Sequence, residues 1–556
     1  MRATASLLFF ASLAIAVAAA PNLLVAYDAA ALLLAGLLAA WVAAWLARVI
    51  EPQTLAGMLG FGAALAAGAL SGYWLASSVW EGEPAGILDQ IARQWQAVRP
   101  TLALTERIND NVLASGLGVL IPLAVGGLIW GHRPQGAMRL IIWCVSAPAL
   151  FLALAAVVLS NSRGAWLALA VAAVAGGYIA VRRRLAREVG GWVAVGDGAL
   201  VILLALPALL VLATLALPAF EPGPLGGSVG AAATSRALLW REGLGLVADY
   251  RFTGSGLGAT MMVLSTYVFI LHVGYLGHVH NFFLEMALEQ GVPGLIAYLC
   301  LAATAVASLI QAYQRRRVPS AQIGAIAASL AALYVHGLVD AGLYVSKLAP
   351  LVFLPIAAAW AVAPPTRARG AGRNGWHLAA RLAAALTPLV LVMALFAWPG
   401  ARSAFQSNLG AVAQSKAELS RYRWPDWPIQ DALRRSAQID LEPALARYAA
   451  ALADDPDSIT AHRRLGQIAL SRGDWAQARR HLEIAYRLAP GQNAGRLLLA
   501  EAYAMTGDTE AAAELLRTAE TGAGQLDGRA WWISQVTGAQ EQAWYAAART
   551  LAAPPQ

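Results

Sequence analysis

Long runs of apolar residues, separated by short polar or basic connections, dominate this sequence up to about position 400. Each run holds about 16 to 25 residues, and about 20 apolar residues in a helix cross the roughly 30 Å hydrocarbon core of a bilayer. The pattern therefore predicts an all-α, polytopic membrane bundle. We expect about eleven spans: Ala5–Ala20, Ala29–Ala47, Leu55–Val79, Val112–Trp130, Leu140–Ser160, Ala165–Ala180, Ala199–Pro218, Val292–Tyr313, Ile323–Asp340, Leu348–Val362 and Leu378–Pro399.

The arginines in the short connections support this arrangement, because cytoplasmic loops carry an excess of Lys and Arg. With Arg2 on the cytoplasmic side, alternation of the spans puts the basic residues of the short loops on that side: Arg48, Arg133, Arg139, Arg182–Arg184, Arg187, Arg315–Arg317, Arg367, Arg369 and Arg373. Residues 80–111, residues 218–291 and the chain after about Gly400 then face outward. In the first of these segments, Ile87 to Val98 have the spacing of an amphipathic helix, which either lies on the membrane surface or simply connects two spans.

The tail after Gly400 has the composition of a soluble domain and repeats with a period of 34 residues. The matching positions are Pro456 and Pro490, Gly473 and Gly507, Asp474 and Asp508, Ala478 and Ala512, and Leu482 and Leu516. This period resembles that of tetratricopeptide repeats, which stack pairs of helices into a solenoid. We therefore expect residues 1–400 to form a membrane domain and residues 401–556 an extracytoplasmic helical domain, which either binds a protein partner or serves as a structural cap.

Composition narrows the class of protein further. The chain is 59% hydrophobic and only 13% charged, whereas soluble domains carry about 25% charged residues. The net charge of +8 does not indicate nucleic-acid binding, because the excess arginines lie in the short loops between spans. Cys144 and Cys300 lie in separate apolar runs, where packing accounts for them better than a disulfide or a metal site does.

The stretch from His278 to Gly294 holds the strongest candidate chemistry. It contains His278 and His280, two of eight histidines, followed by a short helix that Gly291 and Pro293 are expected to end. About eleven residues at 1.5 Å each cannot cross a bilayer, so the helix is predicted to be interfacial or re-entrant. One face of it carries polar residues at four-residue spacing: Asn281, Glu285 and Glu289.

Arginines on the same predicted membrane face complete the pattern. Arg163 lies between the fifth and sixth spans, and Arg236 and Arg241 lie in the outward loop 218–291. Arginine binds phosphate in a bidentate manner and keeps its charge, so it suits a diphosphate at the lipid interface. A neutral histidine can accept the proton of an attacking hydroxyl. Together these residue types indicate group transfer from a lipid diphosphate.

Other interpretations remain open from the residues alone. The arginines could be membrane anchors or partners in structural ion pairs, and His278 and His280 could bind a divalent cation with a carboxylate. Asp110 and Asp340 are isolated in the sequence, so no aspartate cluster predicts a metal-dependent transferase. The run Gly254–Ala259 fits a dinucleotide-binding fingerprint, but without a βαβ unit around it a tight turn is the better interpretation.

Three segments carry a resemblance to a known family: Ser162–Leu167, the run from Arg236 through Trp240 to Gly254–Gly258, and above all His278–Glu285. With them, about Gly116–Val362 resembles the O-antigen ligase and polymerase superfamily, which is similar to GT-C membrane glycosyltransferases. The resemblance implies transfer of a glycan from undecaprenyl diphosphate to an acceptor hydroxyl. It places the reaction on the outer face of the bacterial cytoplasmic membrane, with inversion and without a metal or cofactor.

The resemblance also implies roles for individual residues. Arg163 and Arg236 would engage the donor diphosphate, and His280 would act as the base. The expected substrate-binding or orienting neighbours are His278, Asn281, Glu285 and Arg241, with His336 and Asp340 as further wall residues. The repeat-containing tail resembles those of protein O-oligosaccharyltransferases and some polysaccharide polymerases, so the acceptor stays open among lipid A core, a growing polysaccharide and a protein.

Two other classes of function compete with an enzyme. A transporter of the same lipid-linked glycan would carry charged residues near the middle of its spans. The predicted spans here are almost free of charge, and the candidate residues gather at one membrane edge, which disfavours transport. A non-catalytic scaffold that recruits envelope proteins through the repeats is the other alternative.

Overall fold

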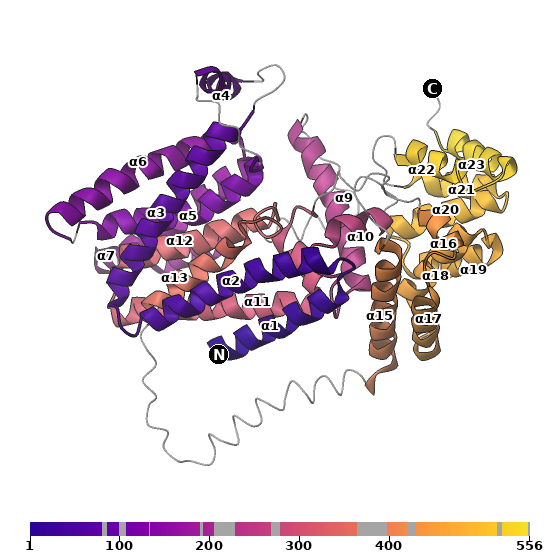
Figure 1. Cartoon of the computed structure of the whole chain (residues 1–556), viewed down its shortest axis with the longest axis horizontal. Coiled ribbons are helices and arrows are strands. Elements are labelled where there is room, and N and C mark those ends of the chain that lie inside the picture. Colours follow the sequence, from indigo (N-terminus) through magenta and orange to yellow (C-terminus); the bar gives the residue numbers. More distant parts are fainter. Residues whose placement is uncertain are drawn as a thin grey trace, which may run out of the picture.

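A computed structural model describes residues 1–79, 86–98, 107–132, 134–188, 193–204, 228–267, 278–363, 397–420, 430–519 and 525–553. Every regular element within these residues is a helix, which confirms the predicted all-α class. Figure 1 shows a bundle of long helices beside a stack of shorter ones. Helices α9 (Ser228–Asp249) and α10 (Thr260–Tyr267) lie between the two.

Seven of the described helices are long and apolar enough to cross a membrane: α1 (Arg2–Ala19), α2 (Leu23–Leu46), α3 (Pro52–Ser77), α5 (Asp110–Trp130), α6 (Ala137–Leu159), α7 (Arg163–Glu188) and α11 (Phe282–Arg315). Their positions agree with seven predicted spans, so the chain is a multi-pass membrane protein. Two more predicted spans correspond to α12 (Ser320–Gly337) and to η2 (Ala349–Phe353) with α13 (Leu354–Val362). Residues 205–227 and 364–396, which hold most of the remaining two, lie outside the described residues, and the number eleven stays a prediction.

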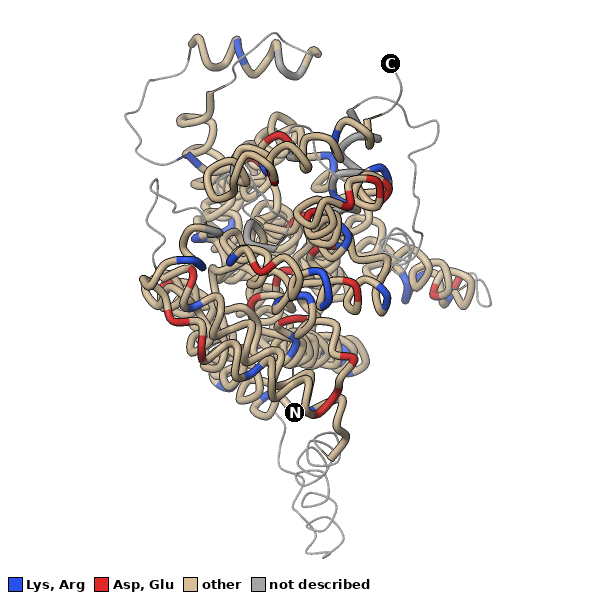
Figure 2. The backbone as a smooth tube through the Cα atoms, turned by 90° about the vertical axis from the view of Figure 1, so that its right-hand side faces the viewer, with Lys and Arg blue, Asp and Glu red and all other residues tan. Residues whose placement is uncertain are grey.

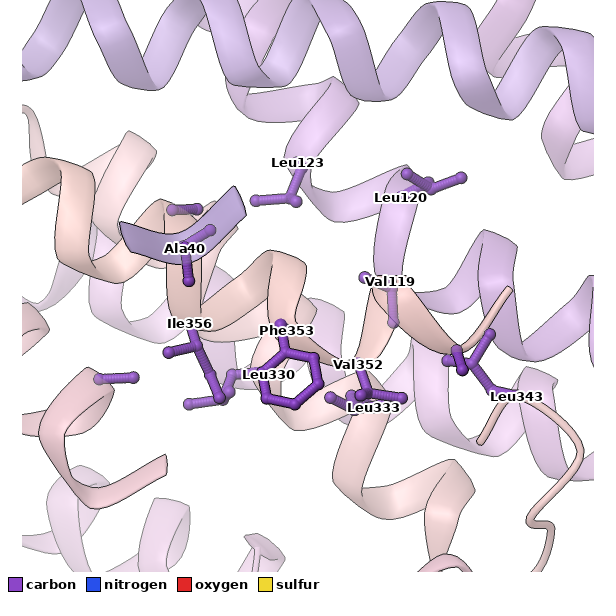
Figure 3. Packing of buried hydrophobic residues seen from close by; sticks show 14 of the residues in the cluster. Ala40, Val119, Leu120, Leu123, Leu330, Leu333, Leu343, Val352, Phe353 and Ile356 are labelled. Atoms are coloured by element: carbon purple, nitrogen blue, oxygen red, sulfur yellow. The ribbon is translucent and has the colours of Figure 1, made fainter. Parts of the chain in front are cut away.

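Small residues let the helices of the bundle approach closely. A Cβ atom added to Gly60 of α3 would lie 2.5 Å from the backbone nitrogen of Gly127 in α5. A Cβ atom on Gly176 of α7 would lie 2.6 Å from the carbonyl oxygen of Gly324 in α12. Apolar side chains from α2, α5, α12, η2 and α13 form the core, and Figure 3 labels some of them, such as Ala40, Leu330 and Phe353. The close pairing of α7 with α12 fixes where Arg163, the first residue of α7, lies.

The short helix predicted after His280 continues directly into a membrane span. Both belong to α11, but Gly291 has the non-helical angles φ 71° and ψ 173°, and Pro293 follows it. The expected break is therefore present as a kink rather than as a loop. The amphipathic helix is present as α4 (Ile87–Val98), and Ile87, Ile91, Trp95 and Val98 are exposed, as apolar residues of a helix on a membrane surface would be.

The tail forms the predicted helical repeats. Its helices are α15 (Pro399–Leu419), α16 (Gln430–Arg435), α17 (Glu442–Asp454), α18 (Ile459–Arg472), α19 (Trp475–Leu488), α20 (Asn493–Met505), α21 (Thr509–Arg517), α22 (Gln525–Ser534) and α23 (Ala539–Ala552). We call α15–α23 the repeat region. The sequence period has a structural cause, because Gly473 and Gly507 have nearly equal left-handed φ angles of 82° and 81°. Asp474 and Asp508 then cap the helices that follow. Acidic and basic positions are interspersed over the repeat region, which faces the viewer in Figure 2.

Candidate active site

The loop that carries both histidines, residues 278–281, is held in place by the residue that starts α11. The Asn281 side-chain oxygen accepts hydrogen bonds from the backbone N–H groups of Phe283 (3.1 Å) and Leu284 (3.0 Å), which makes Asn281 the N-cap. Its amide nitrogen donates to the carbonyl oxygen of Leu338 at 3.0 Å, just after α12. His280 has a φ of 52°, a left-handed conformation that is uncommon for a residue other than glycine. We call residues 278–281 the His280 loop.

Glu285 lies beneath this loop and supports it. Its side chain is fully buried, and its Oε2 atom accepts the backbone N–H of Val279, between the two histidines, at 2.9 Å. Glu289, one turn further on, is 3% exposed and accepts a hydrogen bond from the Thr260 hydroxyl at 3.3 Å. Both carboxyl groups are therefore placed to orient the chain around them rather than to meet a substrate directly.

His278 and His280 have different environments. Nδ1 of His278 accepts the backbone N–H of His280 at 3.2 Å, so the proton of a neutral His278 ring resides on Nε2. Burial, together with the neighbouring His280 and Arg236, lowers the pKa of His278 to about 4, against the opposing effect of Asp340. His278 is therefore neutral at pH 7 and offers an N–H donor.

His280 faces Asp340, which the family resemblance placed among the wall residues of the site. The end of α12 returns to the His280 loop and places Asp340 Oδ2 3.5 Å from His280 Nδ1. Asp340 is buried, and its other oxygen accepts the backbone N–H of Gly342 at 2.7 Å. A carboxylate on the Nδ1 side favours the tautomer that leaves Nε2 with a lone pair, as in other histidine–carboxylate pairs. The two residues are 60 positions apart, and no local pattern could have joined them.

The same three groups also have a geometry that could hold a cation. Ligand atoms of His278, His280 and Asp340 lie within 4.8 Å of one another. Two imidazoles and a carboxylate are a common set of protein ligands for a divalent metal with open coordination positions. Side-chain geometry thus leaves the cation alternative open beside the histidine–carboxylate pair.

Arg163 lies at the same end of the bundle as Asp340. The preceding Ser162 donates a hydrogen bond from its hydroxyl to the side chain of Asn111 in α5, at 3.0 Å. The next residue, Gly164, packs so closely against α12 that an added Cβ atom would lie 3.4 Å from the His336 ring. Arg163 itself is exposed at the start of α7. The helix dipole does not stabilise a cation at a helix N-terminus. The arginine charge and the partial positive charge of the helix N-terminus instead act together to attract an anion.

Helix α9 brings Arg236 close to the His280 loop. Arg236 is partly buried, and its charge acts on both His278 and His336. One turn further along, the Trp240 ring N–H donates to the carbonyl oxygen of His280 at 3.4 Å. Arg241 follows Trp240 and is also partly exposed, but it is five residues from Arg236 and so points from a different side of α9.

The glycine-rich run after α9 forms a tight turn against the kink in α11, as expected. The backbone N–H groups of Ser255 and Gly256 donate to the carbonyl oxygens of Leu288 (2.8 Å) and Glu289 (3.2 Å). Gly254 has a φ of 72°, and a Cβ atom on it would lie only 2.1 Å from the Glu289 carbonyl oxygen. Glycine is therefore required here, for a structural contact rather than for a nucleotide.

An apolar cavity of about 1160 Å³ opens beside these residues. Trp240, Asn281 and Leu338 line it near the His280 loop, and α11 provides much of one wall as far as Tyr313. Arg182 and Asp197, which are paired at 2.6 Å, lie at the far end. The cavity thus leads from the candidate site along a membrane-spanning helix.

Comparisons with known proteins agree with this picture. Residues 148–299 match the O-antigen ligase family, and residues 432–493 and 465–527 match the tetratricopeptide repeat family. No curated protein matches the chain significantly. The first match ends within α11 and includes Arg163, Arg236 and the His280 loop. The chain therefore carries an O-antigen ligase domain followed by tetratricopeptide repeats, which supports a membrane glycan-transfer role in polysaccharide biosynthesis.

Proposed function

We propose that this chain, with its O-antigen ligase domain and tetratricopeptide repeats, transfers a glycan from undecaprenyl diphosphate to an acceptor hydroxyl. One observation carries the proposal. The His280–Asp340 pair, with Arg236 and the start of α7 beside it, adjoins Trp240, Asn281 and Leu338, which line an apolar cavity that follows a membrane-spanning helix. A base, cations for a diphosphate and a channel for a long hydrocarbon chain are the three features that a lipid-diphosphate donor requires.

The donor fits this arrangement in two parts. The polyprenyl chain would occupy the cavity along α11, whose segment from Val292 to Tyr313 is about 33 Å long and so matches the bilayer core. The diphosphate would lie beside the His280 loop, at the end of the cavity lined by Trp240 and Asn281, with Arg163 on α7 and Arg236 on α9 as its ligands. Guanidinium groups suit this role because they form paired hydrogen bonds with phosphate oxygens and keep their charge. The Nε2–H of neutral His278 adds a further donor.

The transfer step then needs only residues of this chain. His280 Nε2 takes the proton of the acceptor hydroxyl while the hydroxyl oxygen attacks C1 of the first sugar. The bond between C1 and the diphosphate oxygen breaks, C1 is inverted, and the diphosphate leaves with the bonding electrons. Asp340 orients the His280 ring and stabilises its positive charge as the proton arrives. Arg163 and Arg236 stabilise the negative charge that develops on the leaving group.

The proposed setting follows from the distribution of arginines in the loops. The protein would lie in the bacterial cytoplasmic membrane, with residues 401–556 and the outward loop 218–291 on the extracytoplasmic side. Membrane lipid surrounds the bundle, and the repeats would be available to a protein partner. The acceptor would be lipid A core, a growing polysaccharide or a protein hydroxyl, so ligase, polymerase and protein O-oligosaccharyltransferase activities all share this site.

Reconstitution in liposomes tests the proposal. The purified protein receives an undecaprenyl-diphosphate glycan and each acceptor class in turn, and mass spectrometry identifies what becomes glycosylated. His280→Ala and Arg236→Ala should abolish transfer without changing insertion or abundance. His132→Ala and Arg139→Ala are matched controls, because both residues are exposed, His132 in the loop between α5 and α6 and Arg139 in the first turn of α6. Normal transfer by the His280→Ala protein would refute the catalytic assignment.

A further inference from the structure

A buried cluster of ionic groups joins the last residue of α9 to the repeat region. Asp249 is 2% exposed, and its carboxylate accepts hydrogen bonds from two arginines of α18, Arg463 and Arg464, the latter at 2.8 Å. Both arginines are 1% exposed. The hydroxyl of Thr460, also in α18, donates to the second carboxylate oxygen at 2.9 Å.

Each of these buried charges would be destabilising in its position if the opposite charges were absent. An acidic residue at the C-terminus of a helix is opposed by the helix dipole, and two neighbouring guanidinium groups repel each other when they are buried. Burial alone would raise the pKa of Asp249, but Arg463 and Arg464 outweigh it and hold that pKa below its ordinary value. The charges at the end of α9 and on α18 are therefore complementary, as the two sides of a specific interface are.

A second contact fixes the turn that follows α9. Asn408 of α15 is fully buried, and its side-chain oxygen accepts the backbone N–H groups of Phe252 (2.8 Å) and Thr253 (3.2 Å). Its amide nitrogen donates to the Thr253 hydroxyl at 2.7 Å. The Tyr250 hydroxyl contacts that of Ser415, also in α15. Three residues of the outward loop, Tyr250, Phe252 and Thr253, are thus bound to α15.

The segment held in this way leads directly to the candidate active site. In one direction, α9 runs back from Asp249 through thirteen residues, or about 20 Å, to Arg236. Midway, Gly243 lets α9 pack closely on α11, because an added Cβ atom would lie 2.9 Å from Leu284. In the other direction, the turn that starts at Gly254 binds the carbonyl groups of α11 at its kink.

We propose that the repeat region acts within its own chain, as the docking surface that holds α9 in place over the His280 loop. Asp249 is the positioning residue of this interface, and it acts on the reaction through Arg236 and Trp240. The α15 and α18 surface accordingly binds the acidic C-terminal residue of α9 and the turn that follows it, within the chain's own outward loop. An external partner would then have to use the other faces of the repeats. The catalytic consequence rests on the proposed function, whereas the docking itself does not.

Hydrogen exchange followed by mass spectrometry tests the docking in the full-length protein. Asp249→Asn removes the charge that the two arginines share, and Thr460→Val removes one hydrogen bond without leaving a charge unpaired. We expect faster exchange in peptides covering residues 250–258 and 278–284, by about tenfold for Asp249→Asn and less for Thr460→Val. The double variant Asp249→Asn with Arg463→Gln should restore part of the protection, because it removes one of the two positive charges that Asp249 neutralises.

A matched control lies inside the repeat region. Glu501 and Arg529 form a buried ion pair between α20 and α22, both within the repeat region. Glu501→Gln should therefore leave both peptides as in the unmodified protein. Unchanged exchange in the two peptides of the Asp249→Asn protein would overturn the proposal. An equal increase in the Glu501→Gln protein would also overturn it, because that result indicates general destabilisation.

Transfer kinetics test the positioning role separately. Displacement of Arg236 should raise the KM for the lipid-linked donor by about tenfold in the Asp249→Asn protein, with a smaller change in the KM for the acceptor. Equal effects on both KM values would contradict positioning through Arg236. If the unmodified protein transfers no glycan, the proposed function fails, while hydrogen exchange still decides whether the repeats dock on the loop.

Discussion

Replacing Asp340 by Asn removes the charge next to His280 while keeping the shape of the site. Asn retains an oxygen that can accept the backbone N–H of Gly342, as Asp340 does at 2.7 Å, so the loop after α12 should keep its fold. The variant loses the negative charge that lies 3.5 Å from His280 Nδ1. If His280 becomes positively charged in the transition state, this loss should slow the reaction.

The size of the effect follows from the distance between the two groups. At 3.5 Å, two unit charges interact by about 1.2 kcal/mol in bulk water and about 4.7 kcal/mol at an effective dielectric constant of about 20. The His280 side chain is 31% exposed and that of Asp340 is 3% exposed, so an intermediate value of about 2.7 kcal/mol is reasonable. This value corresponds to about a hundredfold decrease in kcat.

Single-turnover transfer in liposomes measures this decrease without interference from product release. Asp110→Asn is the matched control, because Asp110 is a second carboxylate that accepts a hydrogen bond, from the Trp74 ring at 2.9 Å. The control should retain nearly full activity. A kcat within about threefold of the unmodified protein for Asp340→Asn would refute the role of Asp340 beside a catalytic base.

Three further predictions concern the support and protonation of the site. Glu285→Gln keeps an acceptor for the Val279 N–H and should remain active. Glu285→Leu leaves that N–H unpaired and should lose about 1–3 kcal/mol of stability, measured by thermal unfolding. Equal stability of the two variants would contradict the hydrogen bond between Glu285 and Val279. The pKa of His278 is lowered from 6.5 to about 4. As the pH falls from 6.5 to about 4, only the unfolded chain therefore binds a proton at this residue, so the stability of the folded protein should fall over that pH range. The decrease should be smaller in the His278→Gln protein. A pH dependence that His278→Gln leaves unchanged would contradict this. Chelation of divalent cations should leave transfer unchanged, and a loss of transfer that added cation restores would favour a metal at His278, His280 and Asp340.

The sequence predicts the helices and repeats better than it predicts the tertiary contacts between them. Runs of apolar residues locate the membrane helices because each must cover the bilayer core, and the period of 34 residues locates the repeats because equivalent caps recur at Gly473 and Gly507. The break at Gly291 could be predicted from a glycine and a proline, although α11 continues after it. These features depend only on neighbours in the chain.

Contacts between segments that are distant in the chain could not be predicted from the sequence. Asp340 follows an apolar helix without any pattern that relates it to His280, and only the return of α12 brings the two together. The ion pairs of Asp249 with Arg463 and Arg464 join positions more than 200 residues apart. A single sequence contains no spacing rule for such pairs, because the fold rather than the local chain decides them.

The most direct test of the central claim is to measure both products of the transfer in one reconstituted reaction. The unmodified protein should release one free undecaprenyl diphosphate for each glycan joined to the acceptor. The His280→Ala protein should give neither product while still binding the lipid-linked donor, and His132→Ala should behave as the unmodified protein. Stoichiometric formation of both products by the His280→Ala protein would contradict the account.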